Sequence, residues 1–297
     1  MYKLIKMKIQ IKQGVVIEWN AVFRNEYEMI SYFLSTMHKN GQIMSDYSML
    51  KEDCYYIVYC TVPDIETLEE KYYNEYSKKV YKYLNIDYEI LGDNIVYYDD
   101  CQCENPRWYL LYCDYTSTRD SSPLFCGDCG ESIPLYKTPY LFNEQEHFNL
   151  LEYQDMYASV DNIWMTSLSD RFSKNQIVNT NSKLNKRGME IRAELERLLN
   201  KPVYLFVRNP IGGWWKYEES NKKLDNCPVC GRELSEPLNK EITGKMCHKC
   251  RIAFNEPSEE SEDGKDEKNE NWHVLWRGVL ASDRWECLPF NEPGWEH

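Results

Sequence analysis

Two pairs of cysteines in the last quarter of the chain have the spacing of a metal site. The first pair lies in the sequence CPVCG at 227–231 and the second in CHKCR at 247–251. Two such Cys-x-x-Cys turns that face each other place four thiolates in a tetrahedral cage, in which Zn–S distances are about 2.3 Å. We therefore predict a zinc ribbon with four ligands: Cys227, Cys230, Cys247 and Cys250. Zn²⁺ held by four thiolates has no open position for water or substrate, so the predicted role is structural.

The residue after each pair bears on the shape of the turn, which we call a knuckle. Gly231 follows the first pair, and glycine reaches backbone conformations that cost other residues free energy. Pro228 stiffens the same turn. The second knuckle has Arg251 at the equivalent position, so we expect it to be the less ideal of the two.

A second cysteine cluster, CGDCG at 126–130, has the same form as the first knuckle. A redox dithiol would place its first cysteine at a helix N-terminus, whereas residues 131–134 (ESIP) favour a turn and then a strand. A knuckle needs two more ligands, and Cys101 and Cys103 are the nearest pair in sequence. Two interpretations stay open: a second Zn²⁺ bound by these residues with Cys126 and Cys129, or a tight turn whose cysteines simply pack.

The sequence carries none of the common catalytic or nucleotide-binding motifs. HExxH, the Walker loop, GxGxxG and GxSxG are all absent, and none of the five histidines has metal-ligand spacing. We therefore expect a non-enzymatic protein.

The charge balance counts against generic nucleic-acid binding. The chain has 48 Asp and Glu residues against 35 Lys and Arg residues, a formal net charge of −13. Nucleic-acid-binding proteins draw much of their affinity from Lys and Arg contacts to phosphate. The ribbon segment is less acidic than the rest, and six basic residues there would supply any phosphate contacts: Lys222, Lys223, Arg232, Lys245, Lys249 and Arg251.

Hydropathy and cysteine usage predict a cytoplasmic protein. The sequence has no run of 18 apolar residues that would form a transmembrane helix. Lysines interrupt the apolar residues at the N-terminus, so no signal-peptide core forms there. Cys-x-x-Cys pairs in a reducing compartment are typical of metal sites rather than disulfides.

Apolar periodicity in the first hundred residues predicts a ferredoxin-like βαββαβ unit. Residues 7–11 alternate as a half-buried strand, and the β-branched and aromatic run 54–62 predicts another. The other predicted elements are a helix at 26–38, a weak strand at 42–50, a helix at 66–83 capped by Asp64, and a strand or hairpin from Tyr88–Ile90 and Ile95–Tyr97.

The rest of the chain predicts a mixed α/β region and several further segments. We expect strands at 108–115, 133–136 and 202–207, helices at 144–168 and 182–199, and a turn at 209–215. The fold class is therefore α+β. The predicted divisions are a ferredoxin-like domain (1–100), a mixed α/β region with a knuckle (101–220), the zinc ribbon (221–256), a disordered acidic linker (257–270) and a Trp-rich tail (271–297) that packs on the body or on a partner.

The aromatic residues of the strand at 54–62 have two possible roles, in RNA binding or in packing. Tyr55, Ile57 and Tyr59 share one face of this strand. In ferredoxin-like domains that bind RNA, aromatic residues on the central strands stack on bases. The alternative is that these tyrosines pack under or between helices, and the RNP1 pattern is absent.

Three features in order resemble a bacterial family of uncharacterised proteins, described as zinc-ribbon-containing and as candidates for nucleic-acid binding. The first is CGDC at 126–129 followed by IPLY at 133–136. The second is the stretch 164–207, with NKRG at 185–188 and PVYLF at 202–206. The third is the terminal cysteine pairs of 227–251. The resemblance covers about residues 100 to 255 and implies a zinc ribbon and a nucleic-acid partner.

Two functions from different classes follow. The first is a zinc-stabilised binding protein that engages nucleic acid or a nucleic-acid-associated complex. The second is an immunity protein or antitoxin that neutralises a basic toxin, because a large negative charge speeds association with basic partners. Neither function requires a membrane.

Overall fold

The computed structural model describes residues 2–14, 23–94, 100–114, 122–166, 168–209, 224–237 and 244–255. Several predicted features lie outside these residues. They are the strand at Ile95–Tyr97, Lys222 and Lys223, the acidic linker 257–270, the Trp-rich tail 271–297 and all but Asn209 of the turn at 209–215.

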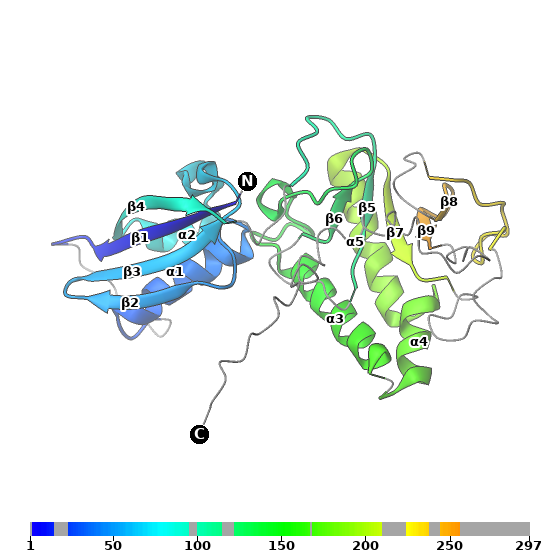
Figure 1. Cartoon of the computed structure of the whole chain (residues 1–297), viewed down its shortest axis with the longest axis horizontal. Helices are drawn as coiled ribbons and strands as arrows, with labels where there is room; N and C mark the ends of the chain where they lie inside the picture. Colours follow the sequence, from blue (N-terminus) through cyan, green and yellow to red (C-terminus); the bar gives the residue numbers. More distant parts are fainter. Residues whose placement is uncertain are drawn as a thin grey trace, which may run out of the picture.

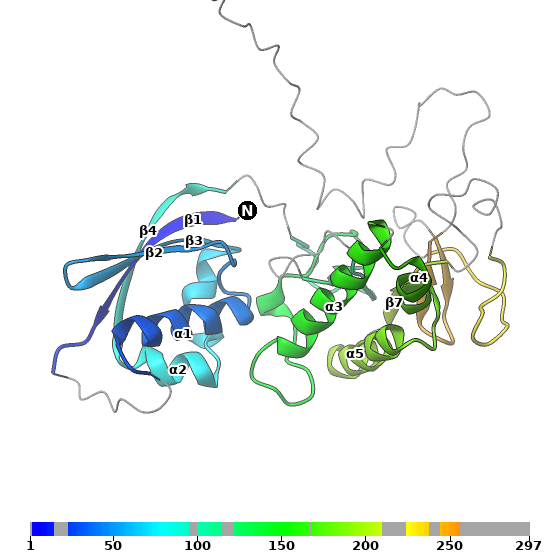
Figure 2. The same ribbon diagram turned by 90° about the horizontal axis from the view of Figure 1, so that it is seen from below.

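The N-terminal part forms a four-stranded antiparallel sheet with two helices on one face (Figures 1 and 2). The strand order is β2-β3-β1-β4. The elements are β1 (Lys3–Ile11), α1 (Glu26–Lys39), β2 (Ser48–Glu52), β3 (Tyr55–Val62), α2 (Glu75–Tyr81) and β4 (Leu84–Asp93). This order and pairing confirm the predicted ferredoxin-like arrangement.

Alternation in β1 builds the core of this unit. Ile5, Met7 and Ile9 are buried beneath the helices, and Phe33 of α1 packs among them. The side chain of Asn25 accepts a hydrogen bond from the Glu28 backbone N–H and starts α1. Apolar side chains that recur every second residue on the strand therefore pack in one layer with those that recur about every 3.6 residues on the helix.

The predicted helix at 66–83 is wrong over its first half. Asp64 caps only a short 3₁₀ turn at Ile65–Leu68, and a second turn follows at Glu70–Tyr72. Asn74 then restarts the helix, because its side chain accepts from the backbone N–H groups of Tyr76 and Ser77. An Asn side chain that competes for local backbone donors favours a cap over a helix interior.

The predicted strand at 42–50 begins only at Ser48. The reason is Gln42, which is buried and donates its side-chain amide to the Thr67 carbonyl, 2.5 Å away. This contact holds the segment against the 3₁₀ turn instead of in the sheet.

The second sheet has five strands in the order β6-β5-β7-β9-β8. Three of them, β5 (Tyr109–Leu111), β7 (Val203–Val207) and β9 (Ile252–Phe254), are parallel to one another. The edge strands β6 (Leu124–Cys126) and β8 (Lys245–Cys247) pair antiparallel. The strands of the predicted ribbon therefore complete the sheet of the middle region.

Three helices pack against this sheet (Figure 2): α3 (Phe148–Met165), α4 (Asp170–Val178) and α5 (Lys183–Leu199). Helix α5 begins where Ser182 accepts from the Asn185 N–H and ends at Asn200, whose φ is +53°. Gly188 faces Tyr153 of α3 so closely that a Cβ there would lie 2.5 Å from the Tyr153 hydroxyl. The predicted helices at 144–168 and 182–199 are confirmed, whereas α4 was not predicted.

The predicted edge strand at 133–136 is wrong. Ser132 bridges to Phe125 and the Ile133 N–H donates to the Leu124 carbonyl at 2.7 Å, but the chain then leaves the sheet and Leu135–Lys137 form a 3₁₀ turn. Pro134 has no N–H to donate to a ladder. Leu135 instead packs against Gly41 of the first unit, where a Cβ would come within 2.6 Å of the Leu135 Cβ.

Polar contacts join the two sheet units beside this turn. The Tyr136 hydroxyl lies 3.1 Å from Glu66, and the Asn74 side chain donates to the Gln145 carbonyl at 2.7 Å. The His147 N–H donates to the Lys39 carbonyl. Within the described parts of the chain, no helix is both long and apolar enough to cross a membrane.

His147 makes this junction sensitive to acid. Burial lowers the pKa of its imidazole to about 3, below the ordinary value near 6.5. Stability is therefore full above about pH 6.5 and falls as pH drops, by about 1.4 kcal/mol per pH unit until the folded pKa is reached. Urea unfolding between pH 7 and 4.5 measures this loss. His147→Gln should flatten the slope, and an unchanged slope would contradict the assignment to His147.

Candidate metal centres

The four C-terminal cysteines come together as predicted from their spacing. Their sulfur atoms all lie within 4.8 Å of one another, and Cys230 Sγ lies 3.6 Å from Cys247 Sγ. Tetrahedral Zn–S bonds of about 2.3 Å place sulfurs about 3.8 Å apart. Cys227 and Cys247 are buried, whereas Cys230 and Cys250 are partly exposed. We call this group the C-terminal tetrad.

Both knuckles of the C-terminal tetrad have the same backbone pattern. Gly231 donates to the Cys227 carbonyl at 2.8 Å, and Arg251 donates to the Cys247 carbonyl at 2.8 Å. The φ angles of these two residues are +69° and +58°. Arg251 therefore adopts the left-handed conformation that glycine takes in the first knuckle.

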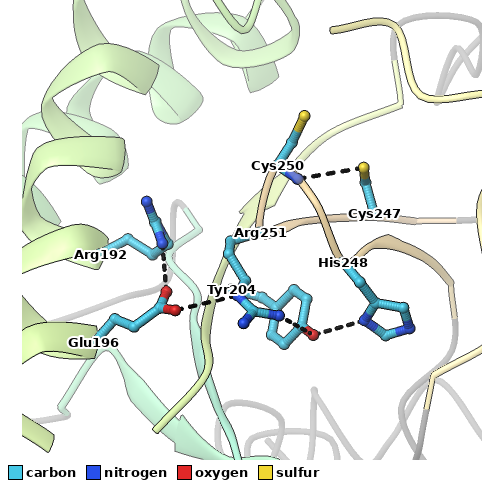
Figure 3. Close-up of polar contacts among 7 residues, drawn as sticks. All are labelled: Arg192, Glu196, Tyr204, Cys247, His248, Cys250 and Arg251. Carbon is cyan, nitrogen blue, oxygen red and sulfur yellow. Dashed lines mark hydrogen bonds and ion pairs between the residues drawn. The ribbon is translucent and has the colours of Figure 1, made fainter. Parts of the chain in front are cut away.

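Side-chain contacts hold Arg251 in this conformation (Figure 3). Its guanidinium lies 3.2 Å from Glu196 of α5 and 3.0 Å from the Tyr204 hydroxyl of β7. That hydroxyl lies 2.7 Å from His248 Nδ1, and Ser235 Oγ lies 2.8 Å from His248 Nε2. The second knuckle is therefore anchored to the helix layer and the sheet by its own side chains.

The thiols of the C-terminal tetrad have unequal acidity. A hydrogen bond from the Arg232 backbone N–H lowers the pKa of Cys230 to about 7. Burial raises the pKa of Cys227 and of Cys250. Since the thiolate is the form that binds a metal, Cys230 is more readily prepared for binding than Cys227 or Cys250.

The other four cysteines also form a cage, which we call the N-terminal tetrad. Cys101, Cys103, Cys126 and Cys129 place their sulfurs within 4.8 Å of one another. The Cys103 N–H points to Cys101 Sγ, and the Asp128 N–H points to Cys126 Sγ, each at 3.4 Å. Burial raises the pKa of Cys129 to about 12 and also raises that of Cys101. This grouping favours the metal interpretation over four cysteines that merely pack.

The CGDCG knuckle repeats the pattern of the C-terminal tetrad and fits closely against the sheet. Gly130 has a φ of +81° and donates to the Cys126 carbonyl at 2.9 Å. A Cβ on Gly127 would lie 2.1 Å from the Trp108 ring. Arg107 binds the Asp128 carboxylate through its backbone N–H and Nε, at 2.8 and 2.7 Å. Gly127, Asp128 and Gly130 of the motif therefore each have a steric or polar reason for their residue type.

The two tetrads lie at opposite edges of one sheet. Cys126 ends edge strand β6, opposite Tyr109 at the start of β5, and Cys247 ends edge strand β8, opposite Ile252 at the start of β9. Both tetrads therefore lie at the amino ends of the parallel strands. Ligand sites of parallel sheets usually form at the carboxyl ends, so this position suits structural centres.

The predicted phosphate-binding residues differ in their availability. Arg232 and Lys249 are exposed. Arg251 is bound to Glu196, and Lys245 lies 3.9 Å from Asp225 and 3.8 Å from Glu236. Lys222 and Lys223 lie outside the described residues. In the described part of the ribbon, Arg232 and Lys249 are thus the predicted residues that are exposed and form no ion pair with a carboxylate.

A buried polar cluster at the carboxyl ends of the strands escaped the sequence analysis. Arg208, directly after β7, lies 2.7 Å from Asp161 of α3, and their side chains are 9% and 0% exposed. Asp114, after β5, accepts from the Tyr112 hydroxyl at 3.0 Å, and Asn255, after β9, accepts from the Asn209 N–H at 2.8 Å. The available signal was a charged or amide residue directly after β7 and β9 and shortly after β5.

Comparison with known proteins gives one partial match. A family model described as a domain of unknown function (DUF2310) matches residues 103–208. This range includes Cys103, Cys126 and Cys129, and it ends before the C-terminal tetrad. Neither the curated proteins nor the solved structures gave a match. The match therefore supports a domain in the middle region and names no activity.

Arg251 allows a test of how the second knuckle is held. Arg251→Ala removes the contacts with Glu196 and Tyr204 and keeps a side chain at positive φ, whereas Arg251→Gly removes the same contacts and relieves the backbone. We expect the glycine variant to be more stable than the alanine variant by about 1 kcal/mol. Urea unfolding of the metal-loaded proteins measures the difference. Equal stabilities would contradict the left-handed backbone at this position.

Proposed function

We propose that the protein is a non-enzymatic, zinc-stabilised binding protein. The observation that carries the proposal is the pair of closed four-cysteine cages at the two edges of one sheet. A metal with four thiolate ligands offers no position to a substrate, so each centre would stabilise the strands that it joins.

The ligands of these cages suit zinc better than the oxygen-binding metals of the cell. Four soft thiolates in tetrahedral reach select Zn²⁺ or iron, whereas magnesium and calcium need oxygen ligands. The backbone N–H groups that point to Cys101 and Cys126 would offset thiolate charge once the thiols are deprotonated.

Metal analysis of the full chain tests this step. We expect two zinc ions per unaltered chain. The double variant Cys126→Ser with Cys129→Ser should keep one ion, and so should Cys227→Ser with Cys230→Ser, because each removes one knuckle. Cys54→Ser, an exposed cysteine outside both tetrads, is the matched control and should keep two. Inductively coupled plasma mass spectrometry of the purified proteins measures the number of metal ions per chain. Iron in place of zinc, or a single ion in the unaltered chain, would overturn the assignment.

We propose a basic protein as the partner, in line with the immunity-protein or antitoxin alternative. The net charge of −13 favours association with a basic surface. In the ribbon segment, Arg251 and Lys245 lie near carboxylates of this chain, so fewer basic groups remain for phosphate.

Single-stranded nucleic acid is the second candidate, and the open face of the first sheet favours it. Lys6 pairs with Tyr59 across β1 and β3, and Tyr59 is exposed on the face opposite the helices. Lys8 lies on the same face, with its Nζ 3.6 Å from the Tyr55 ring centroid. Aromatic and basic side chains on central strands are the combination that single strands bind.

Fluorescence anisotropy with single- and double-stranded DNA and RNA separates the two partners. A basic protein partner predicts no binding to either, even at low salt, because acidic groups repel phosphate. Binding that weakens steeply with salt would instead support nucleic acid. In that case Lys6→Ala with Lys8→Ala should abolish it if the sheet face is used, and Arg232→Ala with Lys249→Ala should do so if the ribbon is used.

A further inference from the structure

Strand β4 leaves one long edge of the first sheet without a neighbour. It spans Leu84–Asp93, pairs with β1 on one side, and ends the strand order β2-β3-β1-β4 (Figure 1). Among the described residues no strand pairs with its other side. A free edge presents backbone N–H and C=O groups that an extended chain can bind.

The helix layer stops short of this strand. Tyr88 pairs with Met7 and Ile90 pairs with Ile5, so both lie on the face that the helices cover. Helix α2 has only seven residues, and Tyr88 and Ile90 remain 47% and 50% exposed. The free edge is therefore bordered on this face by uncovered apolar side chains.

The opposite face of β4 is acidic. Asp87 pairs with Lys8 and Glu89 pairs with Lys6 across β1, so these carboxylates lie on the face away from the helices. Both are exposed, and neither forms an ion pair in the part of the chain that the structure describes. A strand added at this edge would bring its own side chains beside them at about 5 Å.

We propose that β4 docks an extended strand of a basic partner protein, one whose residues alternate between Lys or Arg and apolar side chains. The basic side chains of such a strand would lie beside Asp87 and Glu89, and its apolar side chains would cover Tyr88 and Ile90. This inference rests on the proposed partner class and names the surface and the sequence pattern that it uses.

Charge argues against a second copy as the occupant. An antiparallel pair of β4 strands centred on Tyr88 would set Asp87 of each chain opposite Glu89 of the other, and like charges directly opposite are destabilising. The other edge strand, β2, has only five residues, so it offers a shorter ladder.

A synthetic peptide of four Lys-Val repeats tests the proposal with the zinc-loaded full chain. Anisotropy of the labelled peptide should show binding, and hydrogen–deuterium exchange should slow at 84–93. We expect Asp87→Asn with Glu89→Gln to weaken binding about tenfold. The matched control, Glu52→Gln with Glu144→Gln, removes equal charge away from β4 and should change little.

Three further peptides identify the mode of binding. The first has N-methyl groups on alternate amides, so it keeps the charge but cannot form the backbone hydrogen bonds of a strand pair. The second has all its lysines in one block and all its valines in another, so it keeps the composition but loses the alternation. The third, a Glu-Val peptide, reverses the charge. All three should bind at least tenfold more weakly. Equal binding of the N-methylated or block-ordered peptide would overturn docking at β4 and leave a basic partner in place. No binding of any basic peptide would overturn both.

Discussion

Two cages of four sulfurs, one at each edge of a five-stranded sheet, are the constraint on which the larger part of the molecule depends. Edge strands β6 and β8 have three residues each, so ladder hydrogen bonds alone hold them weakly. Each strand ends in a cysteine of a knuckle, and the knuckle fixes where the strand turns. Segments beside the knuckles also occupy the outer edges of this sheet, because Ser132 bridges to Phe125 of β6 and Ser235 bridges to Met246 of β8, whereas no described strand covers β4 of the first sheet.

The residues that carry regular signals were predictable. Cysteine spacing identified the C-terminal tetrad and offered the N-terminal one as one of two interpretations, and strand and helix periodicity identified β1, β3, α1 and α5. What escaped prediction depends on contacts between distant residues. Gln42 and Leu135 each make a buried polar contact or a close packing contact far along the chain, and these contacts override the local preference for a strand. Asn74 is the exception, because it restarts the helix through backbone donors only two and three residues away. Arg251 shows the same effect within the site, because partners on α5 and β7 compensate a backbone conformation that its residue type disfavours.

The junction of the two units combines features from both. Cys101 of the N-terminal tetrad follows Asp100, whose carboxylate accepts from the Tyr2 hydroxyl at 3.1 Å and from Ser132 Oγ at 2.9 Å. Asp100 is thus bound both to Tyr2, next to the start of β1, and to Ser132, next to the knuckle of the second sheet. The N-terminal tetrad therefore lies directly beside a polar contact that joins the two units.

Sequence separation within each cage bears on the order of folding. The N-terminal tetrad closes a loop from residue 101 to 129 and the C-terminal tetrad one from 227 to 250, whereas the parallel pair β5–β7 joins Tyr109 to Val203. Short loops close at a lower entropic cost than long ones, and parallel pairings of distant residues form slowly. Metal capture would thus assemble the two ends of the sheet as local units, and the helices between them would then bring its centre together.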